Sequence, residues 1–262
     1  MFKNTILSAG LIAAAGALAS ATSANASIQK FSGSSSGNAS TVVFTFNPAN
    51  NDVTVNIQNT TSSVSNIGQA ISGISFSLAN LGSGSLSVDS SAPVGYEGDS
   101  SAGGSLLSNS QLNNPWEIAD SSGTFALGNP KILGNVGGLG LSAGSDYPKR
   151  GPTDLVVETI PNPNGSIGAH DPSLFGQGTN GAEGVTFTLD GTTQSSITSN
   201  TTVTGNLTVY FGTGPDSSIS AESVPVTVPA GGPLPVPATL PLVAGGILAL
   251  GALALRKRGR FQ

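Results

Sequence analysis

Short stretches of the chain alternate between apolar and polar residues. In the stretch DVTVNIQ, for example, Val53, Val55 and Ile57 occupy every second position. The same pattern recurs around residues 74–78, 86–88, 185–189 and 207–211, with further candidates at 40–46 and 154–159. Alternation that is rich in β-branched and aromatic residues is typical of half-buried strands, and clusters of Gly, Asn, Asp and Pro separate the stretches as turns require. The pattern predicts an all-β fold, an antiparallel sandwich or jelly-roll-like body with long Gly/Ser/Asn-rich loops.

The distribution of these stretches predicts one β-rich body at residues 27–212. Two domains, with a boundary near residue 90 or 180, are the alternative. The part from 90 to 180 has many Gly, Pro, Asn and Ser residues and few apolar runs, so we expect long loops and short edge strands there. The nearest candidate for a helix is the stretch 63–73, where apolar residues follow a helical repeat over about two turns. Residues 213–237 have the pattern of a last strand followed by a Pro-rich tether.

The N-terminal segment, 1–26, has the three parts of a secretory signal peptide. Lys3 supplies a positive charge, residues 6–19 are apolar and small, and Ala24-Asn25-Ala26 is an A-x-A cleavage site. We therefore expect a signal helix that signal peptidase removes by cutting before Ser27. The alternative is a transmembrane or buried helix, but the run is short for a membrane span and no basic cluster follows it.

The C-terminal segment has the pattern of a membrane helix with an orienting tail. Residues 238–255 carry no charge, and a helix over them would be about 27 Å long, enough to cross the bilayer core. Four basic residues follow directly, namely Arg256, Lys257, Arg258 and Arg260. By the positive-inside rule this tail stays in the cytoplasm and the body lies outside. A buried helix of a soluble domain is a poor alternative, because the segment is apolar all round.

Residues 234–262 resemble a known sorting signal. A Pro-x-Pro motif, a short helix rich in Gly, Ala and Leu and a terminal basic cluster are similar to the PEP-CTERM family, and in particular to its VPLPA-like variant. The motif positions here are Leu234, Pro235, Val236, Pro237 and Ala238. The resemblance implies a substrate of an exosortase, a membrane-embedded transpeptidase-like enzyme that would cut near Pro237. It also implies a Gram-negative-type bacterium, with transient anchoring in the inner membrane followed by delivery to the cell surface.

Composition and charge narrow the possible functions. Only 9% of the residues are charged, there are 36 Gly and 16 Pro, and cysteine is absent, which excludes thiolate metal sites and a cysteine nucleophile. All 14 acidic residues lie within residues 27–238, whose basic residues are Lys30, Lys131, Lys149 and Arg150. Such an acidic body should repel phosphate backbones, so we expect no nucleic-acid partner.

Motifs that could carry catalysis lack the context they need. Residues 33–37 match the G-x-S-x-G nucleophile elbow, but a strand pattern follows instead of a helix. Residues 138–143 match G-x-G-x-x-A but run into turn residues, so no dinucleotide site is expected. His170, next to Asp171, is the single histidine, which excludes a multi-His zinc site. We therefore predict a body that is not an enzyme, with no catalytic residues, no metal and no cofactor.

Two further features leave a binding role open. Glu97 and Asp99 could join a loop calcium site, although solvated surface is the more common role of such acids. Trp116 could stack on a sugar, but a single Trp is more often a core residue.

The combined pattern favours a non-catalytic exported surface or extracellular-matrix protein, processed by signal peptidase and an exosortase. Exopolysaccharide is a candidate partner. The alternatives are a carbohydrate- or calcium-binding module and, with less support, an exported hydrolase, which would need convergent acids or a serine beside His170.

Overall fold

The computed structural model of the chain describes the β-rich part of the sequence. The described residues are 26–62, 64, 66–97, 106–112, 115–130, 155–157, 174–176, 183–212 and 217–226. The predicted signal peptide before residue 26, the sorting motif Leu234–Ala238, the helix 238–255 and the tail Arg256–Arg260 lie outside them, as does His170. Within the described residues, no helix is both long and apolar enough to span a membrane.

Fourteen strands make up this part of the chain, and two short 3-10 helices, η1 (Ile67–Gln69) and η2 (Asn109–Gln111), lie between them. The strands are β1 (Ser27–Ser35), β2 (Asn38–Asn47), β3 (Asp52–Asn59), β4 (Ile71–Ala79), β5 (Leu86–Val88), β6 (Pro93–Glu97), β7 (Leu107–Ser108), β8 (Glu117–Ser121), β9 (Thr124–Gly128), β10 (Val156–Val157), β11 (Leu174–Phe175), β12 (Val185–Gly191), β13 (Thr202–Phe211) and β14 (Ser218–Val224). The all-β prediction is confirmed for the described residues.

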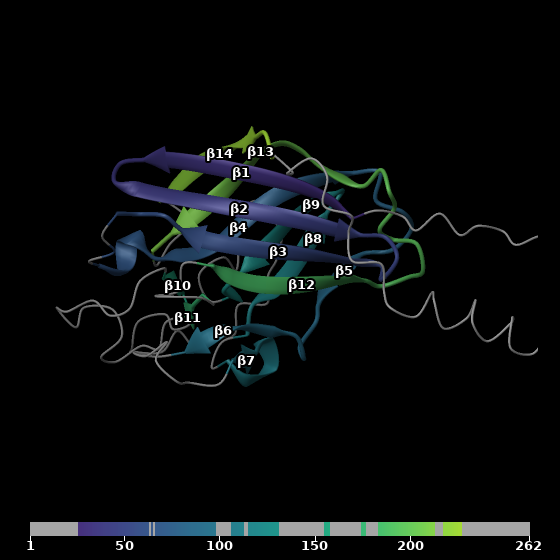
Figure 1. Ribbon diagram of the computed structural model, residues 1–262, viewed down its shortest axis with the longest axis horizontal. Coiled ribbons are helices and arrows are strands. Elements are labelled where there is room, and N and C mark those ends of the chain that lie inside the picture. The colour runs from purple at the N-terminus through teal and green to yellow at the C-terminus, as the bar shows by residue number, and fades with distance from the viewer. Residues whose placement is uncertain are drawn as a thin grey trace, which may run out of the picture. The chain divides into compact units, whose positions relative to one another are not determined.

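The strands form one hydrogen-bonded sheet whose two halves face each other across a common core (Figure 1). One half follows the order β5-β12-β3-β2-β1, and the other contains β13, β4, β9 and β8. The last strand, β14, joins the halves because it pairs with β1 on one side and with β13 on the other. These pairings are antiparallel, as predicted, whereas the short β10 and β11 pair in parallel. The compact unit that holds these strands extends to Pro225.

Tight turns set the register of two hairpins. Between β1 and β2, Ser36 and Gly37 both have a positive φ, of 54° and 82°. Between β8 and β9, Ser122 and Gly123 repeat the arrangement, with φ of 54° and 85°. A two-residue loop with both residues left-handed matches the twist of the flanking strands, which explains why each hairpin is so short.

Alternation along the strands directs one set of side chains into the core. In β2 and β3 every second residue is buried, including Val42, Phe44, Val53 and Ile57. Phe44 links the two halves of the sheet, because its ring centroid lies 5.0 Å from that of Phe76 on β4. The burial of these alternating apolar side chains is the main stabilising contribution of the fold.

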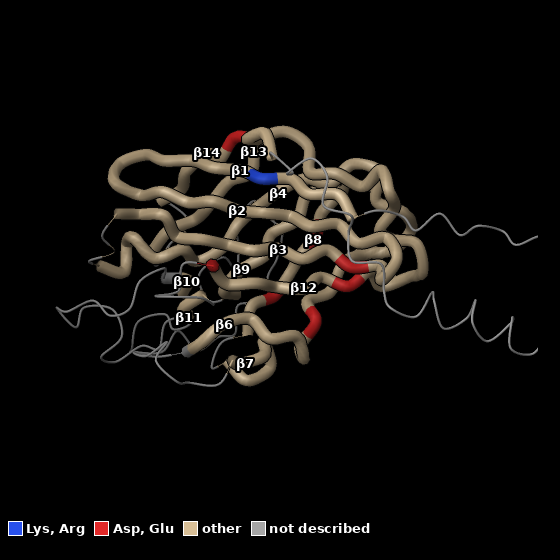
Figure 2. The backbone as a smooth tube through the Cα atoms, in the orientation of Figure 1, with Lys and Arg blue, Asp and Glu red and all other residues tan. Residues whose placement is uncertain are grey.

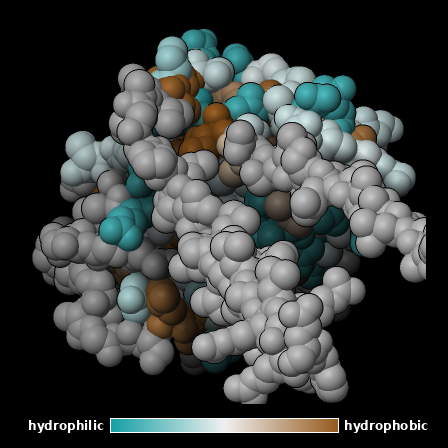
Figure 3. All heavy atoms as spheres, turned by 45° about the vertical axis from the view of Figure 1, so that its right-hand side comes forward, coloured by the Kyte–Doolittle hydropathy of each residue, from teal (hydrophilic) through white to brown (hydrophobic). Residues whose placement is uncertain are grey.

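The outward face is almost free of large apolar side chains. Among the described residues, Ile28, at 45% exposure, is the one large hydrophobic residue that is exposed. On the side seen in Figure 3, the hydrophobic residues appear as separate patches between hydrophilic ones. The described surface therefore offers no broad apolar area for docking.

The alternating stretches and the middle of the chain differ in how well they were predicted. The stretches at 40–46, 53–57, 74–78, 86–88, 185–189 and 207–211 are confirmed as parts of β2, β3, β4, β5, β12 and β13. In the middle the described strands are short, as expected, but β9 is not an edge strand, because it lies between β4 and β8. The helical candidate at 63–73 contains only η1 before β4 begins.

Candidate functional site

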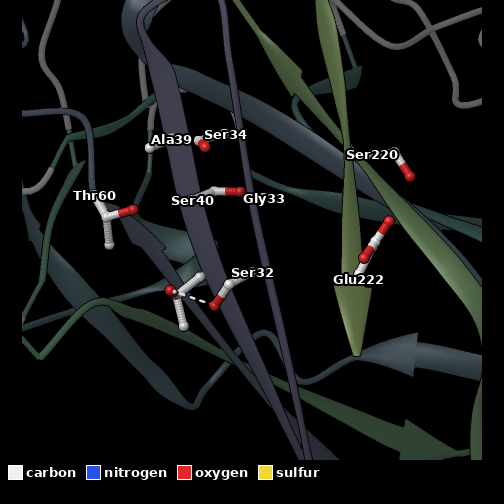
Figure 4. A pocket seen from close by; sticks show the side chains of 9 residues that line it. Ser32, Gly33, Ser34, Ala39, Ser40, Thr60, Ser220 and Glu222 are labelled. Carbon is white, nitrogen blue, oxygen red and sulfur yellow. Dashed lines mark hydrogen bonds between the residues drawn. The ribbon is translucent and has the colours of Figure 1, made fainter. Parts of the chain in front are cut away.

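A shallow polar hollow of about 490 Å³ lies among the described residues where β14, β1 and β2 meet (Figure 4). We call it the hydroxyl-lined hollow, because serine and threonine dominate its lining. The lining residues are Ser32, Gly33, Ser34, Ala39, Ser40, Thr41, Thr60, Ser220 and Glu222. A second hollow of about 350 Å³ adjoins it around the β1–β2 turn and shares Ser34, Ala39 and Thr60 with it.

The crossing of β1 over β14 creates this hollow. The register pairs β1 with β14 from Lys30 to Ser32, and Ser32 lies opposite Glu222. At the next residue, Gly33, a Cβ atom would lie 2.5 Å from the backbone oxygen of Ser220. Only glycine permits so close an approach of the two backbones. Beyond this point the β1–β2 hairpin leaves β14, and the outward side chains of β14 border the open space.

Hydrogen bonds fix part of the lining and leave part of it free. The hydroxyl groups of Ser32 and Thr41 lie 3.0 Å apart across the two strands. The amide of Thr60 donates to the Ala39 carbonyl over 3.0 Å, which holds the end of β3 against β2. Ser40 is different: it is 1% exposed, and its Oγ has no hydrogen-bond partner. Buried hydroxyl groups usually have a partner, so the free Oγ of Ser40 is a notable feature of the hollow.

The lining favours binding by hydrogen bonds over catalysis. Among the described residues that line the hollow, Glu222, which is exposed, is the only ionisable one. Serine hydroxyls become nucleophiles when a base lies within hydrogen-bond reach, and the described lining residues include no histidine or lysine for that role. The G-x-S-x-G match at residues 33–37 lies in the β1–β2 hairpin and is followed by a strand, so it is not a nucleophile elbow.

A group of aspartates lies at another edge of the same sheet. Asp52 on β3 is directly opposite Asp190 on β12, and Asp89 follows β5 beside them, where Figure 2 shows the acidic positions close together. Burial raises the pKa of Asp52, and the nearby Asp190 carboxylate raises it further. Burial likewise raises the pKa of Asp190, with a contribution from Asp89. In contrast, hydrogen bonds from Ser91 hold the pKa of Asp89 below its usual value.

These aspartates do not make a metal site. Among the described residues, no group of three or more His, Cys, Asp or Glu side chains could hold a metal ion. For the predicted calcium pair, Glu97 ends β6 and Asp99 lies outside the described residues. The aspartates at this edge of the sheet therefore act on the fold through the repulsion between their charges.

Replacing Asp190 with asparagine should stabilise the fold at neutral pH. Like charges directly opposite each other on neighbouring strands destabilise a sheet, so we expect a gain of about 0.5 kcal/mol in the free energy of unfolding. A raised pKa means that the folded state holds the proton more tightly than the unfolded chain. Ionisation of Asp190 therefore lowers the free energy of unfolding at pH values above the pKa that this residue has in the folded state. This loss is relieved as the pH falls through that pKa. Urea unfolding of D190N and the wild type from pH 7 to pH 3.5 should show the two converging.

A matched substitution tests whether this gain is specific to the pair. Asp120→Asn removes an exposed charge on β8, outside the group of aspartates, and should leave stability at pH 7 unchanged. An equal gain in D120N would assign the effect to the overall negative charge instead of to the opposed pair.

The structure places the remaining candidate residues as follows. Trp116 is 1% exposed and stacks on Phe187, with a centroid distance of 4.5 Å, so the structure favours its interpretation as a core residue. The G-x-G-x-x-A match at 138–143 and the pair His170-Asp171 lie outside the described residues. Ser27, the residue after the predicted cleavage point, is the first residue of β1.

Sequence reasoning missed the hydroxyl-lined hollow. Its residues come from β1, β2, β14 and the end of β3, and nothing in their local sequence shows that they meet. The signal that could have suggested it is weak: Ser32, Ser34, Ala39 and Thr41 are the outward positions of two adjacent alternating strands. Comparison with known proteins adds no further assignment, because no family model, curated protein or solved structure matches the chain.

Proposed function

We propose that this chain is an exported bacterial surface or extracellular-matrix protein whose body is not catalytic. The observation that carries the proposal is the C-terminal pattern: the Pro-x-Pro motif at Leu234–Ala238, the uncharged run 238–255 and the basic tail Arg256–Arg260. The signal-peptide pattern with its A-x-A site at Ala24–Ala26 adds to it. We also propose the sandwich or jelly-roll-like arrangement as the type of fold.

Both ends of the packed unit support this proposal. The first strand begins at Ser27, so removal of residues 1–26 would leave β1 whole. The last strand ends at Val224, which leaves residues 225–233 as a spacer before the motif. Proline fixes φ and lacks an amide hydrogen, so the motif at 234–238 favours an extended strand that a membrane enzyme could bind.

The proposed partners follow from this organisation. Signal peptidase would act at Ala26-Ser27, and an exosortase would recognise Pro235 and Pro237 while the helix 238–255 holds the chain in the inner membrane. The basic tail would keep the C-terminus cytoplasmic. After cleavage the body would reach the cell surface or the extracellular matrix. Exopolysaccharide is its proposed partner there. Glu222 supplies the single carboxyl group among the described residues of the hydroxyl-lined hollow, which supports a role other than hydrolysis by a carboxylate pair.

Mass spectrometry of the mature protein tests the sorting proposal. We expect the wild-type protein at the cell surface to lack residues 256–260, because the enzyme cuts before the membrane helix. Deleting residues 233–262 should turn the chain into a secreted protein in the medium, since it removes both the motif and the anchor. A mature surface protein that still carries Arg256–Arg260 would contradict the proposal.

Matched proline substitutions separate recognition from general effects of the Pro-rich segment. The double variant Pro235→Ala, Pro237→Ala should accumulate as uncleaved, membrane-held precursor. The double variant Pro225→Ala, Pro229→Ala changes the same number of prolines outside the motif and should be processed like the wild type.

A further inference from the structure

We propose that the hydroxyl-lined hollow binds neutral oligosaccharides, a function that goes beyond surface sorting and does not depend on it. Six of the lining residues carry hydroxyl groups: Ser32, Ser34, Ser40, Thr41, Thr60 and Ser220. Each hydroxyl group both donates and accepts a hydrogen bond. A ligand that matches such a lining must itself present donors and acceptors in close succession, and a sugar ring does so at nearly every carbon.

Ser40 supplies the observation that points to a ligand. Ser40 is one of the residues that line the hollow and lies opposite Gly33, and its buried Oγ has no hydrogen-bond partner. Figure 4 shows its hydroxyl turned toward β1 and β14. An unpaired buried hydroxyl costs about 1–3 kcal/mol. A ligand hydroxyl that drew this side chain toward the open part of the hollow would relieve that cost.

The charges around the hollow select a neutral ligand. The carboxylate of Glu222 accepts hydrogen bonds only, so it suits two neighbouring hydroxyl groups of one sugar. Lys30 lies on the outward face of β1, two residues before Ser32, which is opposite Glu222. This diagonal position places the two residues about 7–8 Å apart on the sheet, within reach of long side chains. Because the two side chains carry opposite charges, we infer that this rim of the hollow favours a neutral ligand.

The size and openness of the site define the expected affinity. A volume of about 490 Å³ is within the range of small-ligand sites, and the adjoining hollow of about 350 Å³ extends the polar strip toward the β1–β2 turn. The two together suit several linked sugar units better than one. None of the described residues that line the two hollows is aromatic, so these residues do not supply the stacking that strengthens many sugar sites. We therefore expect a dissociation constant on the order of 1 mM for one oligosaccharide.

Nuclear magnetic resonance titration of the full chain tests this proposal. The chain would be held in a polyoxyethylene detergent, because detergents with sugar head groups would compete for the site. The probes are isomaltohexaose, cellohexaose and mannohexaose, with an alginate hexamer as the anionic comparison. We expect at least one neutral hexamer to shift the amides of residues 32–34, 39–41 and 220–222 with saturation near about 1–10 mM. The alginate hexamer should leave them in place.

Matched variants assign the binding to the hollow. Thr41→Val keeps the shape and removes a lining hydroxyl, and we expect about fivefold weaker binding, the loss of one hydrogen bond. Thr45→Val makes the same change on the same face of β2, outside the hollow, and should bind like the wild type. Ser220→Tyr fills the hollow from an exposed position and should abolish the shifts, whereas Ser218→Tyr on the same strand should not.

Several results would overturn the proposal. These are the absence of shifts with all three neutral hexamers up to about 20 mM, shifts confined to other residues, or equal weakening in T41V and T45V. Tighter binding of the alginate hexamer would refute the neutral selectivity. Any of these outcomes leaves the sorting proposal intact, because binding is measured on the chain before any processing.

Discussion

Replacing Phe44 with alanine should lower the free energy of unfolding by about 3–5 kcal/mol. The Phe44 side chain is completely buried, and its ring contacts three other aromatic rings. It stacks on Phe46 of its own strand at 6.2 Å and meets Phe31 of β1 and Phe76 of β4 edge to face, at 5.9 Å and 5.0 Å. Since Phe76 belongs to the opposite half of the sheet, removing the Phe44 ring leaves a cavity between the halves that neither strand can fill.

Urea unfolding followed by near-ultraviolet circular dichroism measures this loss. Val43→Ala is the matched control, because Val43 neighbours Phe44 on β2 and points to the outward face. The control should cost less than about 1 kcal/mol, since its side chain is only half-buried. If the two substitutions had equal effects, the division of β2 into an inward and an outward face would be wrong.

Replacing Asn51 with alanine is the second substitution with a large expected effect, about 2–3 kcal/mol. Asn51 lies in the turn between β2 and β3 and has a φ of 60°, a left-handed conformation that asparagine tolerates better than alanine. Its Nδ2 donates to the carbonyls of Gly191 and Thr193, at 3.0 Å and 2.8 Å. Its Oδ1 accepts from the amide of Ile197 at 3.0 Å. One side chain thus connects this turn to the loop that leads from β12 to β13.

The variant Asn51→Gly separates the two causes. Glycine accepts the left-handed conformation but makes none of the three side-chain hydrogen bonds, so we expect it to lose less than alanine does. Thermal unfolding of N51A, N51G and the wild type gives the comparison. A glycine variant as unstable as the alanine variant would mean that the conformation of residue 51 contributes nothing.

The sequence was sufficient to predict the fold class, because alternation is a local signal. The alternating residues Val53, Val55 and Ile57 are enough to predict β3 without information about the strands beside it. The alternating apolar residues of β12 and β13 predict those strands in the same way. The hairpin of β8 and β9 was not identified, although Ser122 and Gly123 are turn residues between apolar positions. Asp120 and Ser121 are consecutive polar and exposed residues at the end of β8, so they interrupt the alternation that defined the other strands.

The hydroxyl-lined hollow could not be predicted from the same signals. It requires Ser32 of β1 to lie opposite Glu222 of β14, a pairing between the first and last strands. Serine and threonine occur at outward positions of all three strands, β1, β2 and β14, inside and outside the hollow, so their presence alone selects no site. What creates the hollow is the crossing at Gly33, where the absent side chain lets two backbones meet. Such long-range pairing depends on the packing of the whole unit.

The position of β14 between β1 and β13 has a consequence for the order in which the protein folds. For a chain that emerges from a membrane channel with its N-terminus first, β1 is among the earliest segments outside and β14 is among the last. The two halves of the sheet acquire their connecting strand only when residue 224 has emerged. In the export that we propose, this late closure would keep the chain unfolded during its passage, because pairing across so many residues is slow to form. Under the same proposal, closure of the sheet would coincide with the arrival at the membrane of the segment that follows β14.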